Sequence, residues 1–287
     1  MKKTFLVLLI FIGISSPLYA VQSTIADVEG YACMGDDKSR KQTEQAALTD
    51  AKKRAVEFTS TYLKSETKVK DFVVEKDLLA AYAQAEVKII QELEKIWYKD
   101  SASGDCYKVK IKAEVVPDVK AMETLAKNTA FADNPVAPLA VKAWTDKKTY
   151  RSGEKIRIYI KGNKPFYARV LYRDAGGETI QLLPNPFRMD NYFNSGAVYE
   201  IPTGNDRFEL DVSPPFGEEN VIVFASTTPL GEIGVESLGA VYQIKSIAQD
   251  IGTQTRGVKL TEKLAGQASP SSAAEFFEDK VVVKTVK

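Results

Sequence analysis

The 287-residue chain contains no histidine and only two cysteines. The lack of histidine excludes Ser-His and Cys-His nucleophile pairs, and also zinc bound by imidazole. Lys plus Arg number 39 and Asp plus Glu 38, so there is no excess of one charge to hold nucleic acid. The sequence also lacks a phosphate-binding glycine loop, a C-x-x-C pair and a G-x-S-x-G nucleophile elbow. We therefore expect no enzymatic activity, no cofactor and no nucleic-acid partner.

A few acidic and amide side chains remain as candidates for chemistry. They are the adjacent pairs Asp36-Asp37 and Glu218-Glu219, and the loop residues Asp190, Asn191 and Asn194. Catalytic carboxylates face each other across a substrate cleft, whereas neighbouring carboxylates on a turn usually point apart. The loop residues lack the acidic spacing of a calcium loop, and turn formation by their side chains explains them. We predict neither a catalytic pair nor a metal site.

The amino terminus has the layout of a secretory signal peptide. Lys2 and Lys3 precede an uncharged apolar run from Phe5 to Ile14, and Ala20 marks a candidate cleavage site. A run of this length forms about 15 Å of helix, roughly half of the hydrocarbon core of a bilayer. We expect residues 1–20 to be removed, which leaves a periplasmic or secreted protein without a membrane span. No cysteine follows the cut directly, so a lipoprotein anchor is not expected.

Export would place Cys33 and Cys106 in an oxidising compartment. An even cysteine count permits one intramolecular bridge, and both residues fall where we place strand ends of one small domain. A redox-active pair is the alternative, but the two cysteines are far apart in the sequence. We predict a structural disulfide between them.

Residues 21–118 have the pattern of an α+β domain, an antiparallel sheet backed by helices. The residues Ala47, Ala51, Ala55, Phe58 and Tyr62 follow helical spacing after Ser39, and the small alanines suit close packing on a sheet. We predict strands at 25–33, 67–74, 87–97 and 106–116 and a short helix at 77–84. In the hairpin formed by the last two strands, Glu92 and Glu94 can face lysines at 108, 110 and 112.

These elements resemble a known domain. The segments that carry the resemblance are Val28-Glu29-Gly30-Tyr31-Ala32, the alanine-spaced helix and the strand from Tyr107 to Val115. They are similar to the amino-terminal domain of flagellar assembly protein T and related envelope lipoproteins. The resemblance implies a role in the cell envelope and carries no catalytic signature.

Beyond a predicted linker at 119–139, the chain becomes rich in short strands. We predict strands at 155–161, 166–172, 179–183, 208–212 and 220–226, separated by glycine and proline turns. Strands at intervals of about ten residues favour an all-β sandwich, which we place at 140–245. Residues 246–287 form an extension with a helical turn at 246–251 and short strands at 257–260 and 280–284. We expect the last strand to return to the edge of the sandwich, because an exposed and unpaired Val281-Val282-Val283 run would be prone to aggregation.

This second region resembles the domain-of-unknown-function 4384 family. The matching features include Pro165-Phe166-Tyr167-Ala168, Gly176-Gly177, Leu183-Pro184-Asn185-Pro186-Phe187, Ile201-Pro202 and Pro215-Phe216-Gly217. The resemblance implies a compact β-sandwich attached to varied partners in bacteria, with no established activity.

We predict that the loop 184–194 is the partner-binding surface of the sandwich. Its candidate contact residues are Phe187, Arg188, Met189, Tyr192 and Phe193, which are of types enriched at interface cores. In the alternative interpretation, Phe187 and Phe193 close the open end of the sandwich as core residues. The expected function is that of a non-enzymatic interaction module, with envelope or secretion-complex proteins as partners. Carbohydrate or small-ligand binding by the sandwich is the alternative function.

Overall fold

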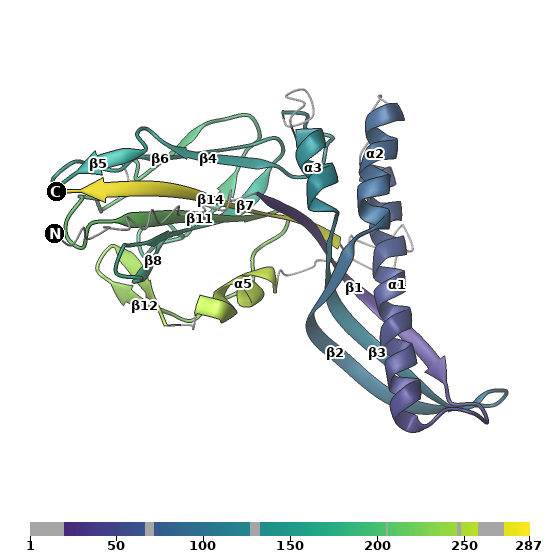
Figure 1. Cartoon of the computed structure of the whole chain (residues 1–287). Helices are drawn as coiled ribbons and strands as arrows, with labels where there is room; N and C mark the ends of the chain where they lie inside the picture. The colour runs from purple at the N-terminus through teal and green to yellow at the C-terminus, as the bar shows by residue number, and fades with distance from the viewer. Residues whose placement is uncertain (1–19, 67–71, 127–132, 205, 246–247, 258–272) are drawn as a thin grey trace, which may run out of the picture.

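A computed structural model describes residues 20–66, 72–126, 133–204, 206–245, 248–257 and 273–287 (Figure 1). Nearly all of the predicted signal peptide, residues 1–20, lies outside them. The elements are β1 (Val21–Cys33), α1 (Arg40–Glu66), α2 (Phe72–Ala83), β2 (Glu86–Asp100), β3 (Gly104–Val116), α3 (Val119–Ala126), β4 (Val141–Thr145), β5 (Thr149–Arg151), β6 (Ile158–Gly162), β7 (Phe166–Arg173), β8 (Thr179–Leu183), β9 (Tyr192–Phe193), β10 (Tyr199–Ile201), β11 (Glu218–Ser226), β12 (Val235–Leu238), β13 (Val241–Ile244), α5 (Ala248–Arg256) and β14 (Ala273–Val286).

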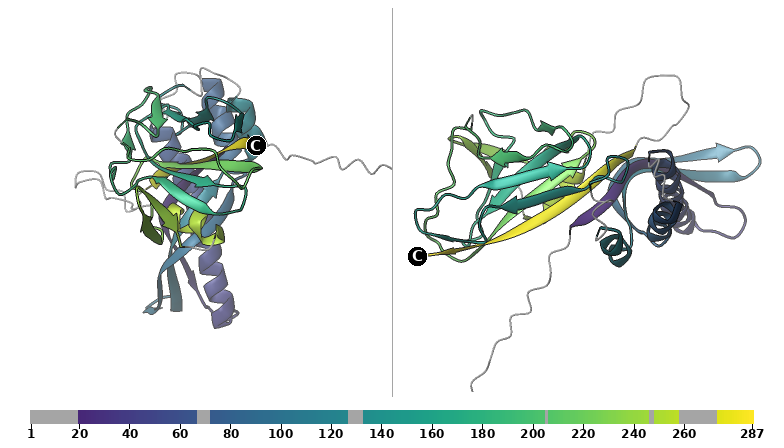
Figure 2. Two further views of the ribbon diagram at one scale, coloured as in Figure 1. Left: turned by 90° about the vertical axis from the view of Figure 1, so that its left-hand side faces the viewer. Right: turned by 90° about the horizontal axis from the view of Figure 1, so that it is seen from above.

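The chain is mostly β, and one large curled sheet runs through it. Its strand order is β12-β13-β8-β7-β11-β14-β1-β3-β2, with β5 and β9 pairing off this path. The strands pair antiparallel, except that β5 is parallel to β14. Figure 2 shows β14, in yellow, reaching from the β-rich part of the molecule to β1, in purple. The segments predicted as separate α+β and sandwich domains therefore share one continuous sheet.

The position of β14 differs from the expected edge strand. It pairs with β1 over residues 273–278 and with β11 over residues 276–284, so it is a central strand. The apolar run Val281-Val282-Val283 correctly indicated a strand that needs a partner. The pattern did not indicate the second partner, because β1 lies about 250 residues away and long-range pairing leaves no local signal.

Helix α1 forms where the alanine spacing predicted it. Ser39 and Gln42 form a capping box, in which the Ser39 N–H donates to Gln42 Oε1 at 2.8 Å and the Gln42 N–H donates to Ser39 Oγ at 3.3 Å. The buried side chains of the helix are Thr43, Ala47, Ala51, Ala55, Thr59 and Leu63. They pack on β1 and β3, and a Cβ on Gly30 would lie 2.2 Å from the Ala47 carbonyl oxygen. The glycine thus permits the close helix-sheet packing that the alanines require.

The β2–β3 hairpin and the disulfide agree with the sequence predictions. Cys33 and Cys106 are directly opposite each other on β1 and β3 and are bonded. Glu94 forms an ion pair with Lys108 at 3.2 Å, across the face of the sheet that points away from α1. Its neighbour Glu92 instead contacts Lys95 on its own strand.

Three predicted strands differ from the structure. For the strand predicted at 67–74, residues 67–71 are outside the described residues and 72–74 belong to α2, because the stretch continues into a helix whose Leu78 and Tyr82 are buried. The segment 208–212 forms only an isolated bridge between Asp211 and Lys155. The segment 257–260 lies almost entirely outside the described residues.

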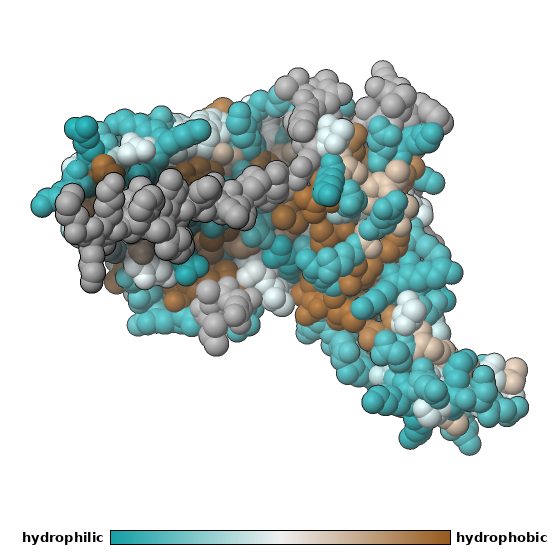
Figure 3. All heavy atoms as spheres, viewed as in Figure 1, coloured by the Kyte–Doolittle hydropathy of each residue, from teal (hydrophilic) through white to brown (hydrophobic). Residues whose placement is uncertain are grey.

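Two main clusters of buried side chains hold the fold together. One lies between α1, α2 and the sheet formed by β1 and β3. The other joins the three-stranded sheet β10-β6-β4 to β7, β11 and β14 of the large sheet. Figure 3 shows apolar side chains gathered where β2 passes the helices, whereas the far end of the hairpin is mostly hydrophilic.

Polar side chains connect the parts of the molecule around β14. Arg256 of α5 donates to Glu114 of β3 at 2.7 Å and to Glu278 of β14 at 2.6 Å. No helix among the described residues is long and apolar enough to cross a membrane.

Candidate partner-binding surface

The loop between β8 and β9 is held in one conformation by Asn185. Its side chain is fully buried and makes local hydrogen bonds at both ends. Asn185 Oδ1 accepts the N–H groups of Phe187 at 2.9 Å and Arg188 at 2.8 Å, while Nδ2 donates to the Leu182 carbonyl at 3.0 Å. In such an Asx turn, the side chain pairs with backbone groups that have no partner from regular secondary structure.

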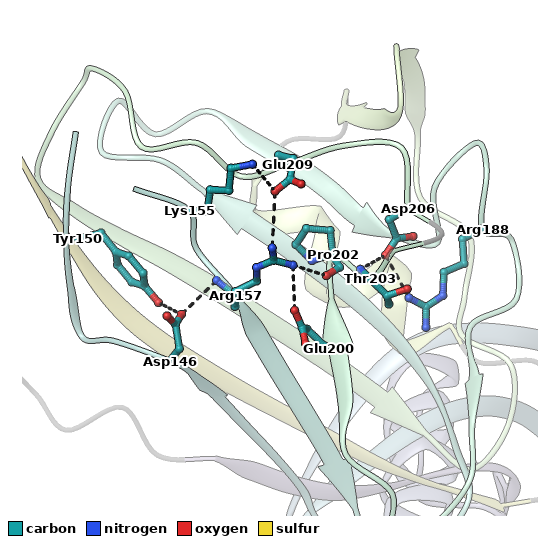
Figure 4. Close-up of polar contacts among 10 residues, drawn as sticks. All are labelled: Asp146, Tyr150, Lys155, Arg157, Arg188, Glu200, Pro202, Thr203, Asp206 and Glu209. Atoms are coloured by element: carbon teal, nitrogen blue, oxygen red, sulfur yellow. Dashed lines mark hydrogen bonds and ion pairs between the residues drawn. The ribbon is translucent and has the colours of Figure 1, made fainter. Parts of the chain in front are cut away.

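The carboxylate of Asp206 anchors the same loop from the other side. Its side chain is fully buried and accepts the Thr203 N–H at 2.8 Å. Arg188 Nη1 lies 3.3 Å from Asp206 Oδ2 (Figure 4). Asn185 Nδ2 lies 3.3 Å from Asp206 Oδ1. A buried carboxylate requires such partners, because burial of an unpaired charge is costly. Arg188 is therefore part of the support of the loop.

A second polar network continues from Asp206 into the three-stranded sheet. Arg157 of β6 bonds Glu200 of β10 at 2.9 Å and the Pro202 carbonyl at 3.4 Å. It also approaches Glu209, which Lys155 contacts at 3.3 Å. Figure 4 shows these groups converging on the guanidinium of Arg157. They fix the chain that leads from β10 to Asp206.

Tyr150 and Asp146 close the other end of this network. The Tyr150 hydroxyl donates to Asp146 Oδ1 at 2.5 Å, and the same oxygen accepts the Arg157 N–H. Burial, followed by the bond to Asp146, raises the pKa of Tyr150 to about 12. The hydroxyl therefore stays protonated and acts as a structural donor.

Of the five predicted contact residues, Arg188 supports the loop, three are exposed and one is buried. Phe187, Met189 and Tyr192 are 49%, 65% and 46% exposed, on a loop that its own hydrogen bonds immobilise. Phe193 is only 2% exposed and stacks with Phe166 at 5.3 Å between ring centroids. Alternation along the two-residue strand β9 places Tyr192 outside and Phe193 inside. Phe193 is thus the core residue that the alternative interpretation described, and Phe187 is not.

Three residues outside the predicted loop extend the exposed group. The ring centroids of Tyr167 and Tyr192 are 5.0 Å apart, Arg207 lies 4.4 Å above the Phe187 ring, and the Tyr242 hydroxyl lies 3.7 Å from Met189 Sδ. We call the whole set the aromatic surface: Tyr167, Phe187, Met189, Tyr192, Arg207 and Tyr242. Sequence patterns did not point to Tyr167 or Tyr242, because each comes near the loop only through strand pairing. Tyr167 lies opposite Tyr192 in the β7–β9 pair, and Tyr242 lies opposite Gln181 in the β13–β8 pair.

The loop candidates Asp190 and Asn191 make hydrogen bonds that hold the backbone. Asp190 Oδ1 accepts the Tyr192 N–H at 3.1 Å, and Asn191 Nδ2 donates to the Ala168 carbonyl at 2.9 Å. Glu218 is exposed and Glu219 buried, as expected for neighbours on one strand. Among the described residues, no three or more Cys, Asp or Glu side chains form a group that could hold a metal ion.

Two surface hollows are too small for a typical organic ligand. One, of about 210 Å³, is lined by Lys161, Asn163 and Ser195 among others, and one of about 170 Å³ lies between α5 and the sheet beside Phe224. Ligand pockets generally measure about 300–1,000 Å³. The exposed aromatic surface is the stronger candidate for binding.

Residues 149–229 match the family model of DUF4384, a domain of unknown function. The matched segment spans β5 to β11 and includes all of the aromatic surface except Tyr242. The match confirms the predicted resemblance for this segment. The description of the family names no activity. No curated protein and no solved structure matches the chain.

Proposed function

We propose that the protein is a non-enzymatic interaction module of the bacterial cell envelope that binds an envelope or secretion-complex protein through the aromatic surface. The observation that carries the proposal is the combination of exposed Phe187, Met189 and Tyr192 with a rigid, internally bonded loop. Aromatic side chains, methionine and arginine are enriched in the cores of protein interfaces. A loop that is already ordered loses less conformational entropy on binding.

The location in the envelope rests on the amino-terminal sequence. The lysines at 2 and 3, the short apolar run and Ala20 support export and cleavage, and the resemblance to flagellar assembly protein T supports an envelope role. We treat the part before the 119–139 linker as an α+β module and the DUF4384-containing part as a β-sandwich module. The intact mass of protein purified from the periplasm tests export, since an uncleaved chain would contradict it.

Crosslinking in intact cells tests the partner. The wild-type chain and the triple variant Phe187→Ala, Met189→Ala, Tyr192→Ala are compared for the envelope proteins that they capture. The matched control is Val198→Ala, which removes an exposed apolar side chain outside the aromatic surface. We expect the triple variant to lose the captured protein at an unchanged melting temperature, and the control to retain it. Equal capture by all three chains would reject the surface as the interface.

Carbohydrate binding is the second candidate function. The tilted Tyr167–Tyr192 pair, with Tyr192 half exposed, is the observation that favours it. Glycan screening of the purified chain separates the two functions. Binding of a glycan that is lost in Tyr192→Ala and kept in Met189→Ala would support the carbohydrate site over the protein interface.

A further inference from the structure

Strand β2 is the last strand at one end of the large sheet. Among the described residues it pairs only with β3, so its other side is a free edge. Free edges are templates for pairing with a further strand, and proteins often protect them with bulges and charges. The fold leaves β2 partly protected and partly open.

Both register shifts of β2 lie before Glu94, between Ile89 and Gln91 and between Glu92 and Glu94. From Glu94 to Lys99 the pairing with β3 is regular. We call the segment 94–99 the hairpin edge. Ladder groups alternate between the two sides of a strand, so every second residue of this segment presents its N–H and C=O outward.

The hairpin edge is accessible and carries apolar side chains. Helix α1 packs mainly on β1 and β3, and touches this segment where Arg40 and Glu44 contact Trp97. On the opposite face, Ile96 is 42% exposed and Tyr98 is also exposed. These side chains stand at the end of the hairpin, which is otherwise mostly hydrophilic (Figure 3).

We propose that a second copy of this chain pairs with the hairpin edge in antiparallel orientation, about a two-fold axis at Ile96. This register places Ile96 opposite its own counterpart, Lys95 opposite Trp97 of the second copy, and Glu94 opposite Tyr98 of the second copy. The Ile96 pair lies on the axis and occurs once, whereas the other two contacts each occur twice. The three contacts are an apolar pair, a cation beside an aromatic ring, and a carboxylate beside a phenol hydroxyl.

Charge selects this register among its neighbours. Residues that lie opposite each other in the pair have their side chains on the same face of the sheet, so the two-fold axis must pass through a residue and not between two residues. We call that residue the centre of the register, and its nearest alternatives are Lys95 and Trp97. A centre at Lys95 places the two copies of Lys95 opposite each other. A centre at Trp97 places Lys95 opposite Lys99 and Glu94 opposite Asp100. Like charges directly opposite each other are destabilising, so of the three centres at Lys95, Ile96 and Trp97 only Ile96 has none within the hairpin edge.

Sedimentation velocity of the mature chain over a concentration series tests the proposal. The short edge predicts a weak dimer with a dissociation constant in the micromolar range. Ile96→Glu sets two carboxylates against each other and should weaken the dimer by about tenfold or more. The matched control is Val235→Glu on β12, the strand at the other end of the sheet, which should dimerise like the wild type. Equal melting temperatures of the variants confirm that they fold.

Disulfide trapping supplies a second readout. Cys33 and Cys106 are bonded to each other, so Ile96→Cys adds a single free thiol that should form a covalent dimer upon oxidation. Lys88→Cys, before both bulges on the same strand, should not. A monomer at all concentrations, a dimer that survives Ile96→Glu, or a dimer lost in Val235→Glu would overturn the proposal. Trapping of Ile96→Cys to a different envelope protein, with purified chain monomeric, would assign the edge to a foreign strand instead.

Discussion

Lys164 and Glu275 form a buried ion pair, with 2.9 Å between Nζ and Oε2, although 111 residues separate them. Lys164 lies between β6 and β7, and Glu275 lies on β14 where that strand passes from β11 to β1. Glu275 also accepts the Leu139 N–H. One carboxylate thus connects the C-terminal strand to the chain before β4 and to the β6–β7 turn.

This carboxylate predicts a pH dependence of stability. Burial raises the pKa of Glu275 above the ordinary 4.5, and Lys164 offsets only part of that effect. A raised folded-state pKa means that the stability from this group is fully present below the unfolded pKa and is lost as pH rises through the folded pKa. We expect the melting temperature of the wild type to fall more steeply from pH 4.5 toward neutral pH than that of Glu275→Gln. Parallel pH profiles would contradict the assignment.

Removal of Arg188 should destabilise the chain rather than only weaken binding. Arg188→Ala leaves the buried Asp206 carboxylate without its cation, and we expect a loss of about 2 kcal/mol in the free energy of unfolding. Arg207→Ala is the matched control, because Arg207 is exposed and lies over Phe187. Chemical denaturation of both variants measures the difference, and equal midpoints would show that the Arg188–Asp206 pair contributes nothing.

The close contact of α1 with β1 predicts that a substitution at Gly30 strongly destabilises the fold. Gly30→Ala places a Cβ 2.2 Å from the Ala47 carbonyl oxygen and 2.3 Å from the Ala51 nitrogen, both of which are backbone atoms. Helix and sheet must separate, so we expect destabilisation of about 3 kcal/mol or more. Gly204→Ala is the control, since its Cβ would meet no atom within 4 Å. Thermal unfolding followed by circular dichroism checks both variants.

The disulfide predicts a loss of stability upon reduction. Cys33 and Cys106 close a loop with a sequence separation of 73, for which the chain-entropy relation gives about 4 kcal/mol. Cys33→Ser with Cys106→Ser should lower the free energy of unfolding by up to this amount. Urea titration with and without reductant provides the measurement. If the double variant matched the oxidised wild type, the bridge would have no stabilising role.

Local patterns predicted the elements whose faces are clearly divided between core and solvent. The stripe from Ala47 to Ala55 and the alternation from Tyr107 to Val115 each predicted one element correctly. The strand predicted at 67–74 was wrong for residues 72–74, because Val73 and Val74 favour strands locally but belong to α2. Loop residues such as Phe193 could not be assigned to core or surface before β9 was known, because a one-residue change of register reverses the two faces.

The central place of β14 affects the order in which the chain can fold. Ribosomes make the polypeptide from its amino terminus, so β1 and β11 exist before the strand that joins them. Until residues 273–286 emerge, each of these two strands has an unfilled side, and Glu114, Arg256 and Glu278 cannot yet meet. The sheet is therefore completed only after β14 has been made, and a chain that stops before β14 would leave one side of both β1 and β11 unpaired at the same time.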